Sequence, residues 1–315
     1  MALYVVTGGA GFIGSHLCDA LLAAGDTVRV LDDLSTGRRN NLDPRAELVV
    51  GDVADAGLAT RVLAGAAGCF HLAAVASVAR AHEDWLGTHR ANQTGTIAVL
   101  DAARRVGPIP VVYASSAAIY GDQGAGPIGE DARPRPLSAY GADKLGSELH
   151  AAVAFGVHGV PTLGLRFFNV YGPRQDPASP YSGVISIFAA RIAAGLPVTV
   201  HGDGLQTRDF VYVDDIVGHL LAAMRRLRTT PEARVLNACT GRATTVLALA
   251  HALAEAAGCA GIVRFGPARP GDIGFSLGDP TSSRAVLRVT AATTLADGLA
   301  RTLAHLRPTT LPLVA

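Results

Sequence analysis

The sequence is poor in aromatic residues, charged residues and cysteine. Aromatic residues make up 5% of its 315 residues and charged residues 17%, and there is one tryptophan. The four cysteines lie far apart and form no CxxC pair, which argues against a zinc ribbon or a disulfide framework. Lys and Arg number 27 against 26 Asp and Glu, so the net charge of +1 argues against nucleic acid as a partner.

Long hydrophobic runs are also missing. Because no stretch of about 18 uncharged apolar residues occurs, we expect no membrane partner. The first residues, MALYVVTGG, carry no basic region of a signal peptide, and we expect a cytoplasmic location. The histidines form no HxxxH or HExxH pattern, so we predict no metal site. Apolar residues nevertheless reach 49%, enough for a large core.

Apolar, β-branched runs alternate with helical patterns through the first half of the chain. Strands are predicted at Leu3–Thr7, Thr27–Leu31, Glu47–Val50, Gly68–Ala74, Pro110–Ser115 and Thr162–Phe167. This alternation predicts an α/β fold with a doubly wound parallel Rossmann sheet. After Phe168 the pattern loosens. We therefore predict a Rossmann domain over 1–168 and a smaller mixed α/β domain over 169–315, with segments that pack back onto the first.

A glycine-rich turn joins the first strand to the first helix. Gly8, Gly11 and Gly14 have GxxGxxG spacing, which lets a pyrophosphate approach the backbone. The first N–H groups of the helix, at Phe12 and Ile13, then face the anion. We predict a dinucleotide site here; packing of the helix on the sheet is the simpler reading.

Carboxylates follow the second and third strands. Asp32 lies 18 residues after Gly14, where it can accept hydrogen bonds from the adenosine ribose and repel a 2′-phosphate, which favours NAD over NADP. Asp33 could share this role. Asp52 is placed to reach the adenine amino group, and its alternative role is a helix N-cap.

A possible catalytic group comes from one strand end and one helix. Tyr140 and Lys144 lie four residues apart on a predicted helix and share one face. The Lys144 ammonium, with a nicotinamide cation close by, should lower the pKa of the Tyr140 phenol, so that the phenol acts as a base. Ser116 follows a strand and can relay the proton of a substrate oxygen.

Ordered blocks of sequence extend these motifs over nearly the whole chain. They include TGGAGFIGSH, HLAAVASV, SSAAIYG, YGADK, LRFFNVYGPRQ, GDGLQTRDFVYVDD and RPGDIGFSLGD. With these blocks the chain resembles the extended short-chain dehydrogenases/reductases of the nucleotide-sugar epimerase/dehydratase family. Within that family the similarity is greatest to UDP-glucose 4-epimerases. The resemblance implies a bound NAD, a UDP-sugar substrate held by residues 169–315, and a homodimer formed through the helices that begin near Asn92 and Ser138.

The resemblance also implies roles for further residues. Contacts with the cofactor are implied for Val53, Leu72, Ala73, Ala74, Asn92, Phe168, Tyr140 and Lys144. Contacts with the substrate are implied for Ser77, Ser116, Asn169, Arg174, Arg208, Arg269, Asp272 and Ser276. Among these, Arg208 and Arg269 would clamp the diphosphate, and Asp272 would orient the uridine ribose or Arg269. His71 is interpreted as strand packing.

The reaction follows from what stands beside Ser116. Dehydratases of the family carry an Asp-Glu pair where this chain has Ala117 and Ala118, and methyl groups cannot transfer protons. We therefore expect NAD-dependent 4-epimerisation of a UDP-hexose through a 4-keto intermediate. The resemblance implies that Ser276 stands at the position that sets tolerance of an N-acetyl group in family epimerases. A serine there leaves room for an acetamido group, so UDP-GlcNAc/UDP-GalNAc are expected beside UDP-Glc/UDP-Gal. Alternatives are a UDP-glucuronate 4-epimerase using Arg174, a 4-keto reductase, or an NAD-binding sensor or scaffold without activity.

Overall fold

The computed structural model describes residues 1–177, 183–259, 261–269 and 271–306. Its largest element is a seven-stranded parallel sheet with the order β10-β6-β5-β4-β1-β2-β3. The strands are β1 (Leu3–Thr7), β2 (Thr27–Asp32), β3 (Glu47–Val50), β4 (Gly68–His71), β5 (Val111–Ser116), β6 (Thr162–Phe167) and β10 (Ala233–Ala238). The order reverses between β1 and β4, which is where such sheets bind ligands. The predicted fold class is confirmed.

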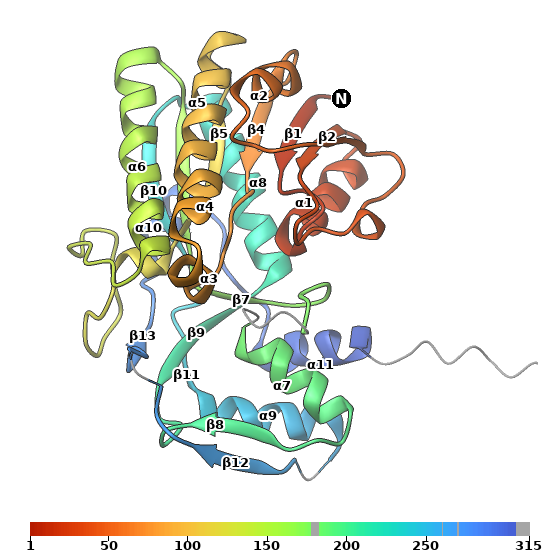
Figure 1. Ribbon diagram of the computed structural model, residues 1–315, viewed down its shortest axis with the longest axis vertical. Helices are drawn as coiled ribbons and strands as arrows, with labels where there is room; N and C mark the ends of the chain where they lie inside the picture. The colour runs from red at the N-terminus through yellow and green to blue at the C-terminus, as the bar shows by residue number, and fades with distance from the viewer. Residues whose placement is uncertain (178–182, 260, 270, 307–315) are drawn as a thin grey trace, which may run out of the picture.

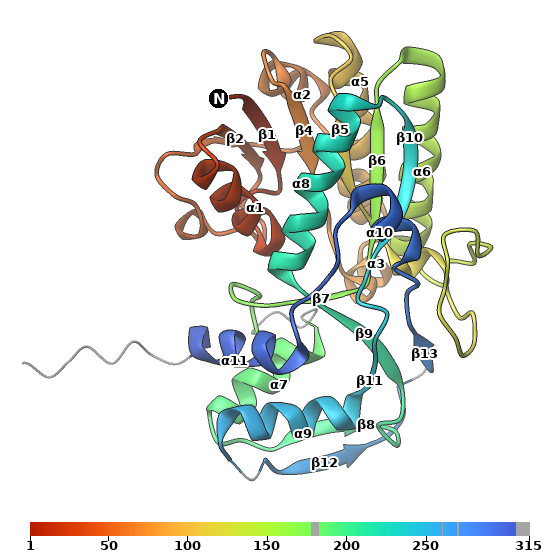
Figure 2. The same cartoon turned by 180° about the vertical axis from the view of Figure 1, so that it is seen from behind.

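Helices cover both faces of this sheet, as Figures 1 and 2 show from opposite sides. One face carries α1 (Phe12–Ala23) and α8 (Val213–Thr229), and the other carries α2 (Ala56–Leu63), α5 (Gly95–Arg105) and α6 (Ala139–His158). Successive strand residues therefore enter different cores: Val6 packs on the α1/α8 side and Val5 on the α2/α5/α6 side. This burial on both faces explains why the strands read as continuous apolar runs.

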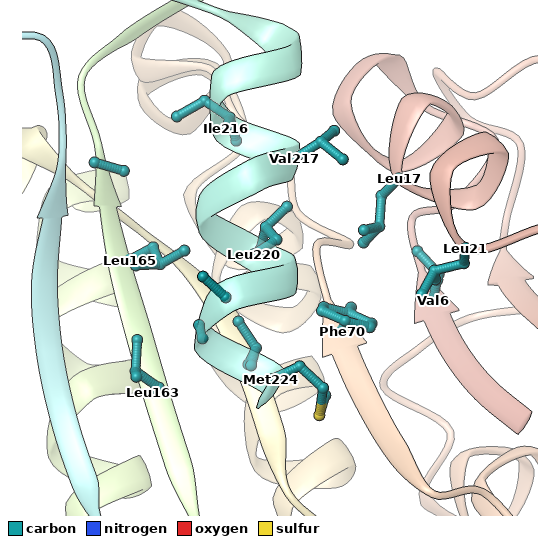
Figure 3. Close-up of a cluster of buried hydrophobic side chains, with 14 of the residues drawn as sticks. Val6, Leu17, Leu21, Phe70, Leu163, Leu165, Ile216, Val217, Leu220 and Met224 are labelled. Atoms are coloured by element: carbon teal, nitrogen blue, oxygen red, sulfur yellow. The ribbon is translucent and has the colours of Figure 1, made fainter. Parts of the chain in front are cut away.

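The helix α8 belongs to the second half of the chain but packs on the large sheet. Its residues Ile216, Leu220 and Met224 face Phe70 of β4 and Leu163 of β6 (Figure 3). The strand β10, also from the second half, pairs in parallel with β6. Segments after residue 168 thus pack back onto the sheet, while the division into 1–168 and 169–315 stays a prediction.

A smaller mixed layer lies beyond the carboxyl ends of the large sheet (Figure 1). Its strands are β7 (Asn169–Tyr171), β9 (Thr207–Tyr212), β11 (Ala243–Thr245) and β13 (Phe275–Ser276), with a separate pair of β8 (Val198–His201) and β12 (Val263–Gly266). They pack with α7 (Val184–Ala193), α9 (Val246–Ala257) and α11 (Leu295–Leu306). Of the two cavities described below, one lies between this layer and the large sheet, and the other lies within the smaller layer.

The remaining elements are short. They are η1 (Arg39–Asn41), α3 (Val78–Glu83), α4 (Trp85–His89), the π-helical turn η2 (Arg90–Thr94), η3 (Ala117–Ile119) and α10 (Thr281–Leu287). Among them, η2 contributes Ala91 to the wall of a cavity described below. In the part of the chain that the structure describes, no helix has the length and apolarity to cross a bilayer. That same part holds no group of three His, Cys, Asp or Glu side chains arranged for a metal.

Candidate active site

The glycine turn packs so tightly that side chains are excluded from it. Gly8 has φ +70, and a Cβ there would lie 2.7 Å from the Ala73 nitrogen. A Cβ on Gly14 would lie 2.2 Å from the Gly8 carbonyl oxygen. No side chain among the described residues caps the N-terminus of α1, so its first N–H groups are available to an anion. The turn therefore fits a dinucleotide pyrophosphate.

Asp32 connects the end of β2 to this turn. Its Oδ2 accepts a hydrogen bond of 3.0 Å from the Ala10 N–H, and its Oδ1 accepts one of 2.8 Å from the Leu34 N–H. The side chain is buried, and burial raises the pKa of the carboxyl group against the effect of these bonds. Each carboxylate oxygen keeps acceptor capacity for a ribose hydroxyl. Asp33 accepts from Ser35 and is exposed.

Asp52 lines the same cavity but is already engaged. Its Oδ2 accepts from Arg90 at 2.8 Å, and its Oδ1 accepts from the Ala54 N–H at 2.8 Å. The cap of α2 is Asp55, which accepts from the Leu58 N–H. The alternative role of Asp52 as a helix N-cap is therefore wrong, and an adenine contact stays a prediction.

A cavity of about 460 Å³ runs from the glycine turn to the predicted catalytic group. All but one of the residues predicted to contact the cofactor line this cavity. Those residues are Gly8, Gly11, Phe12, Ile13, Gly14, Asp32, Asp33, Asp52, Val53, Leu72, Ala73, Ala74, Tyr140, Lys144 and Phe168. Such a volume, bounded by an open helix N-terminus and a buried carboxylate, suits NAD. The structure thus brings together residues that the sequence spreads over 160 positions.

Asn92 is the exception and acts through the backbone. It lies in the π-helical turn η2, 1% exposed. Its Oδ1 accepts from the Val75 N–H at 2.8 Å, and its Nδ2 donates to the Val75 carbonyl at 3.2 Å. Because Val75 lines the cavity, Asn92 shapes the cavity wall, and its contact with the cofactor stays a prediction. Helical turns of this kind are frequent at functional sites.

The three predicted catalytic residues meet where β5 and α6 face each other. Ser116 ends β5, and its Oγ accepts from the Ala118 N–H at 3.1 Å. The helix α6 begins after Ser138, whose side chain accepts from the Gly141 N–H. One turn of this helix brings Lys144 Nζ to 5.8 Å from the ring centroid of Tyr140. Lys144 Nζ also donates a 2.8 Å hydrogen bond to the Ala114 carbonyl on β5.

Burial shifts the pKa values of both Tyr140 and Lys144. Burial raises the pKa of the Tyr140 phenol, and a hydrogen bond with Ser116 opposes that effect. Burial lowers the pKa of Lys144 to about 8. In the protein alone, desolvation of the phenol outweighs the Lys144 ammonium, and the lowering of the phenol pKa by that ammonium together with a nicotinamide cation stays a prediction.

A second cavity of about 370 Å³ adjoins the first, since Asn169 lines both. The predicted residues Arg208, Arg269 and Asp272 line it. The sequence did not single out its other polar lining residues, which are Arg191, Thr199, His201 and Gln206. Gln206 lies within the block GDGLQTRDFVYVDD, and the other three lie outside the quoted blocks.

Arg208 and Asp272 form a pair inside this cavity. Arg208 Nη2 donates to the Asp272 carboxylate. Its Nη1 donates to the carbonyl oxygens of Thr207 and Ile273, each at 2.8 Å. The Asp272 side chain therefore orients Arg208 rather than Arg269, and its contact with the uridine ribose stays a prediction. Arg269 is exposed and lines the same cavity.

Three of the described residues that were predicted to contact the substrate line neither of the two cavities. Arg174 forms an ion pair of 2.7 Å with Asp19 of α1, so its sugar contact is corrected to a contact that holds its loop. Ser77 Oγ caps α3 by accepting from the Arg80 N–H at 3.0 Å, and its contact with the substrate stays a prediction. Ser276 is 8% exposed on β13, in register with Arg208 on β9.

His71 is a structural residue, as interpreted from the sequence. It is buried on β4, with Nδ1 at 2.7 Å from Thr7 Oγ1 and Nε2 at 3.1 Å from Thr96 Oγ1. Burial lowers its pKa to about 3. A neutral imidazole therefore links β1, β4 and α5.

Comparisons with known proteins agree with this geometry. Residues 4–239 match the family described as "NAD dependent epimerase/dehydratase family". A UDP-glucose 4-epimerase of Mycolicibacterium smegmatis is 39% identical over 96% of this chain and 98% of its own length. The crystal structure of a Thermotoga maritima UDP-glucose 4-epimerase with UDP-glucose is 36% identical, with a TM-score of 0.92, and covers 96% of this chain and 98% of the other. A UDP-N-acetylglucosamine 4-epimerase from Methanobrevibacter ruminantium, in complex with UDP-N-acetylmuramic acid, is 31% identical, with a TM-score of 0.91 over 96% and 97% of the chains.

Proposed function

Because the chain belongs to the NAD-dependent epimerase/dehydratase family, we propose that it inverts the C4 centre of a UDP-hexose through a 4-keto intermediate. The chain is an NAD-dependent nucleotide-sugar epimerase. The proposal concerns the carbon atom that it inverts and the sugar that it binds. One observation carries it. The cavity that fits NAD ends at Ser116, Tyr140 and Lys144 and adjoins a cavity lined by Arg208 and Arg269.

The cofactor cavity assigns holding roles to residues of this chain. The open N-terminus of α1 would take the pyrophosphate, and Asp32 would take the adenosine ribose. When bound, NAD supplies a ring that takes up hydrogen with its electron pair from the sugar and gives it back. Because that exchange has no net redox change, the cofactor is recycled.

Tyr140 is the proposed base and acid. Its phenol accepts the proton of the sugar O4 as C4 is oxidised and returns it when C4 is reduced. Ser116, hydrogen-bonded to the same phenol, binds the sugar oxygen and can relay the proton. The Lys144 ammonium favours the phenolate once the site also holds the positive charge of the oxidised cofactor.

The reacting sugar must turn over between the two halves of the reaction. A guanidinium suits the diphosphate, since it presents several N–H donors in a plane. Arg208 is fixed by Asp272 and by carbonyl oxygens, and Arg269 is exposed beside it. The two arginines would hold the nucleotide while the 4-keto sugar presents its other face.

The absence of acids beside Ser116 favours epimerisation over dehydration. The turn η3 that follows Ser116 carries Ala117 and Ala118. Their methyl groups cannot remove a C5 proton or protonate a leaving hydroxyl group. Tyr140 and Ser116 are sufficient for exchange at C4.

We propose the hexoses UDP-Glc/UDP-Gal and the N-acetylhexosamines UDP-GlcNAc/UDP-GalNAc as substrates. Ser276 is small and lies next to the Arg208 backbone position, and a similar structure is a UDP-N-acetylglucosamine 4-epimerase. The uronic acid alternative rested on Arg174, which pairs with Asp19 instead.

The test is NMR of a UDP-sugar panel incubated with purified protein and no added cofactor. The proposal expects each C4 epimer to convert to a mixture with its partner. Absence of any change at C4 across the panel would refute the proposal. Consumption of one equivalent of NAD(P)H per turnover would identify a 4-keto reductase instead. Binding of NAD without conversion of any nucleotide sugar would identify a sensor or scaffold.

A homodimer is proposed from one face of α6. Leu149, Val153 and Val157 follow each other at one-turn spacing and expose 63%, 55% and 69% of their surfaces. Ile97 of the adjacent α5 is 39% exposed. An apolar stripe of this kind on two packed helices suits pairing with a second copy through a four-helix bundle.

A further inference from the structure

The segment after β7 is fixed at three points, two on α1 and one in the loop after β2. The Pro173 carbonyl oxygen lies 3.0 Å from His16 Nε2, Arg174 pairs with Asp19, and Asp176 pairs with Arg38. Arg174 holds φ +66, a left-handed backbone conformation that a residue with a Cβ keeps only where its surroundings enforce it. The segment is therefore positioned firmly. In Figure 1, β7 crosses the middle of the molecule between the large sheet and the α7–α9 layer.

Gln175 lies between these fixed points and lines the cofactor cavity. Its Nε2 points at the Val170 carbonyl oxygen at 3.4 Å. Its Oε1 is buried and has no hydrogen-bond partner among the described residues. Because a carbonyl oxygen only accepts, the amide nitrogen belongs on Val170, and this leaves Oε1 as the free atom of a side chain that lines the cavity. A buried acceptor without a donor is costly, and such an atom calls for an explanation.

We propose that Gln175 is a cofactor-binding residue whose Oε1 accepts a hydrogen bond from a hydroxyl or amide N–H of bound NAD. The chemistry of the free atom selects the donor. Phosphate oxygens at neutral pH carry no proton to donate, whereas the ribose hydroxyls and the carboxamide do. The contacts of Pro173, Arg174 and Asp176 with His16, Asp19 and Arg38 position the segment around Gln175 before the cofactor binds. Binding therefore requires little further ordering of the Gln175 side chain. The inference rests on NAD as the cofactor and not on the sugar that reacts.

The test compares Gln175→Met with the matched control Gln123→Met. Methionine keeps an unbranched side chain of similar length and lacks the amide. Gln123 donates to the Tyr120 and Arg133 carbonyls, away from the cavity. Protein loaded with NADH is chased with excess NAD, and the loss of NADH fluorescence gives the dissociation rate. Loss of one hydrogen bond should speed dissociation about five- to tenfold in Gln175→Met, with the control at the wild-type rate.

A second arm uses affinities for ADP-ribose and ADP, measured by calorimetry. Weaker binding of ADP-ribose with unchanged binding of ADP places the donor on the nicotinamide-side ribose. Weaker binding of both places it on the adenosine side, and an effect on NADH alone places it on the carboxamide. Unchanged dissociation of NADH and unchanged affinities for both fragments would overturn the inference. Epimerase activity is a separate outcome: its absence would sink the proposed function and leave this measurement valid.

Discussion

Lys144 Nζ lies 5.8 Å from the centre of the Tyr140 ring and directs its hydrogen bond to the Ala114 carbonyl rather than to the phenol. The phenol instead bonds with Ser116, and burial raises its pKa. Lys144 thus acts on Tyr140 through its charge and through space. A proton acceptor with this environment is poor until further positive charge enters the cavity, which couples proton transfer to the loaded enzyme.

Replacing Tyr140 with phenylalanine tests the proposed base. The change removes the only atom of this side chain that can carry the proton and leaves the ring that packs in the cavity. We expect the rate of C4 exchange to fall about 10²- to 10⁴-fold, the usual contribution of a positioned acid or base. NMR of the UDP-sugar mixture measures the rate, and bound NAD(H) should stay near the wild-type content. A variant that turns over at the wild-type rate would remove Tyr140 from the mechanism.

Replacing Arg269 or Arg208 with alanine should have different effects on UDP affinity and on folding stability. Arg269 is exposed, so Arg269→Ala should weaken UDP binding about 10- to 100-fold with little change in folding stability. Arg208 also bonds to the carbonyls of Thr207 and Ile273 and to Asp272, so Arg208→Ala should lose binding and about 1–3 kcal/mol of stability. Calorimetry with UDP and urea unfolding separate the two effects. Equal affinity of Arg269→Ala and wild type would exclude Arg269 from the diphosphate site.

Ser276→Tyr tests the size limit on the sugar. Ser276 is 8% exposed and lies in register with Arg208. A large ring there must project toward the cavity that Arg208 lines or displace the neighbours of Ser276. We expect activity on UDP-GlcNAc to fall at least about tenfold more than activity on UDP-Glc. The ratio of kcat/KM for the two sugars measures this. An equal loss on both sugars would show that Ser276 has a packing role only.

His71 should make folding stability sensitive to acid. Its pKa is lowered to about 3 in the folded protein, so below pH 6.5 the unfolded chain binds this proton first. The contribution of His71 is fully present above pH 6.5 and is lost as pH falls toward 3, by about 1.4 kcal/mol per pH unit. His71→Gln should remove this part of the slope in urea unfolding measured from pH 7 to pH 5. His251→Gln, at an exposed position on α9, is the control; an unchanged slope in His71→Gln would contradict the assignment.

The stripe on α6 should control the oligomeric state. Placing charge there, as Leu149→Glu with Val153→Glu, would desolvate two carboxylates in an apolar interface. We expect wild type to be a dimer at micromolar concentration and the double variant a monomer, by light scattering coupled to size exclusion. Ile262→Glu, at a side chain 60% exposed elsewhere, is the matched control. A monomeric wild type, or a double variant that stays dimeric, would refute the homodimer.

Local signals were enough to predict the exact bounds of three of the seven strands of the large sheet and the bounds of two more to within one residue. The strands at Leu3–Thr7, Glu47–Val50 and Thr162–Phe167 have the predicted bounds, because apolar β-branched runs end at glycine, aspartate or polar loops. The strand predicted over Gly68–Ala74 ends at His71, since the backbone beyond it turns to line the cofactor cavity. β10 was missed, because its apolar run is short and gains its place only by pairing with β6.

The sequence by itself determined the cofactor turn, the pairing of Tyr140 with Lys144 on one helix face, and the residue types that can do the chemistry. Those features depend on spacing within a few residues, and spacing is read directly from the chain. The tertiary structure decided the rest. Arg174 pairs with Asp19, Asp272 with Arg208, and Gln175 faces the cavity, because each depends on a partner brought close by folding. The pKa of Tyr140 rises for the same reason: the fold removes water from the phenol, and no local pattern records that loss.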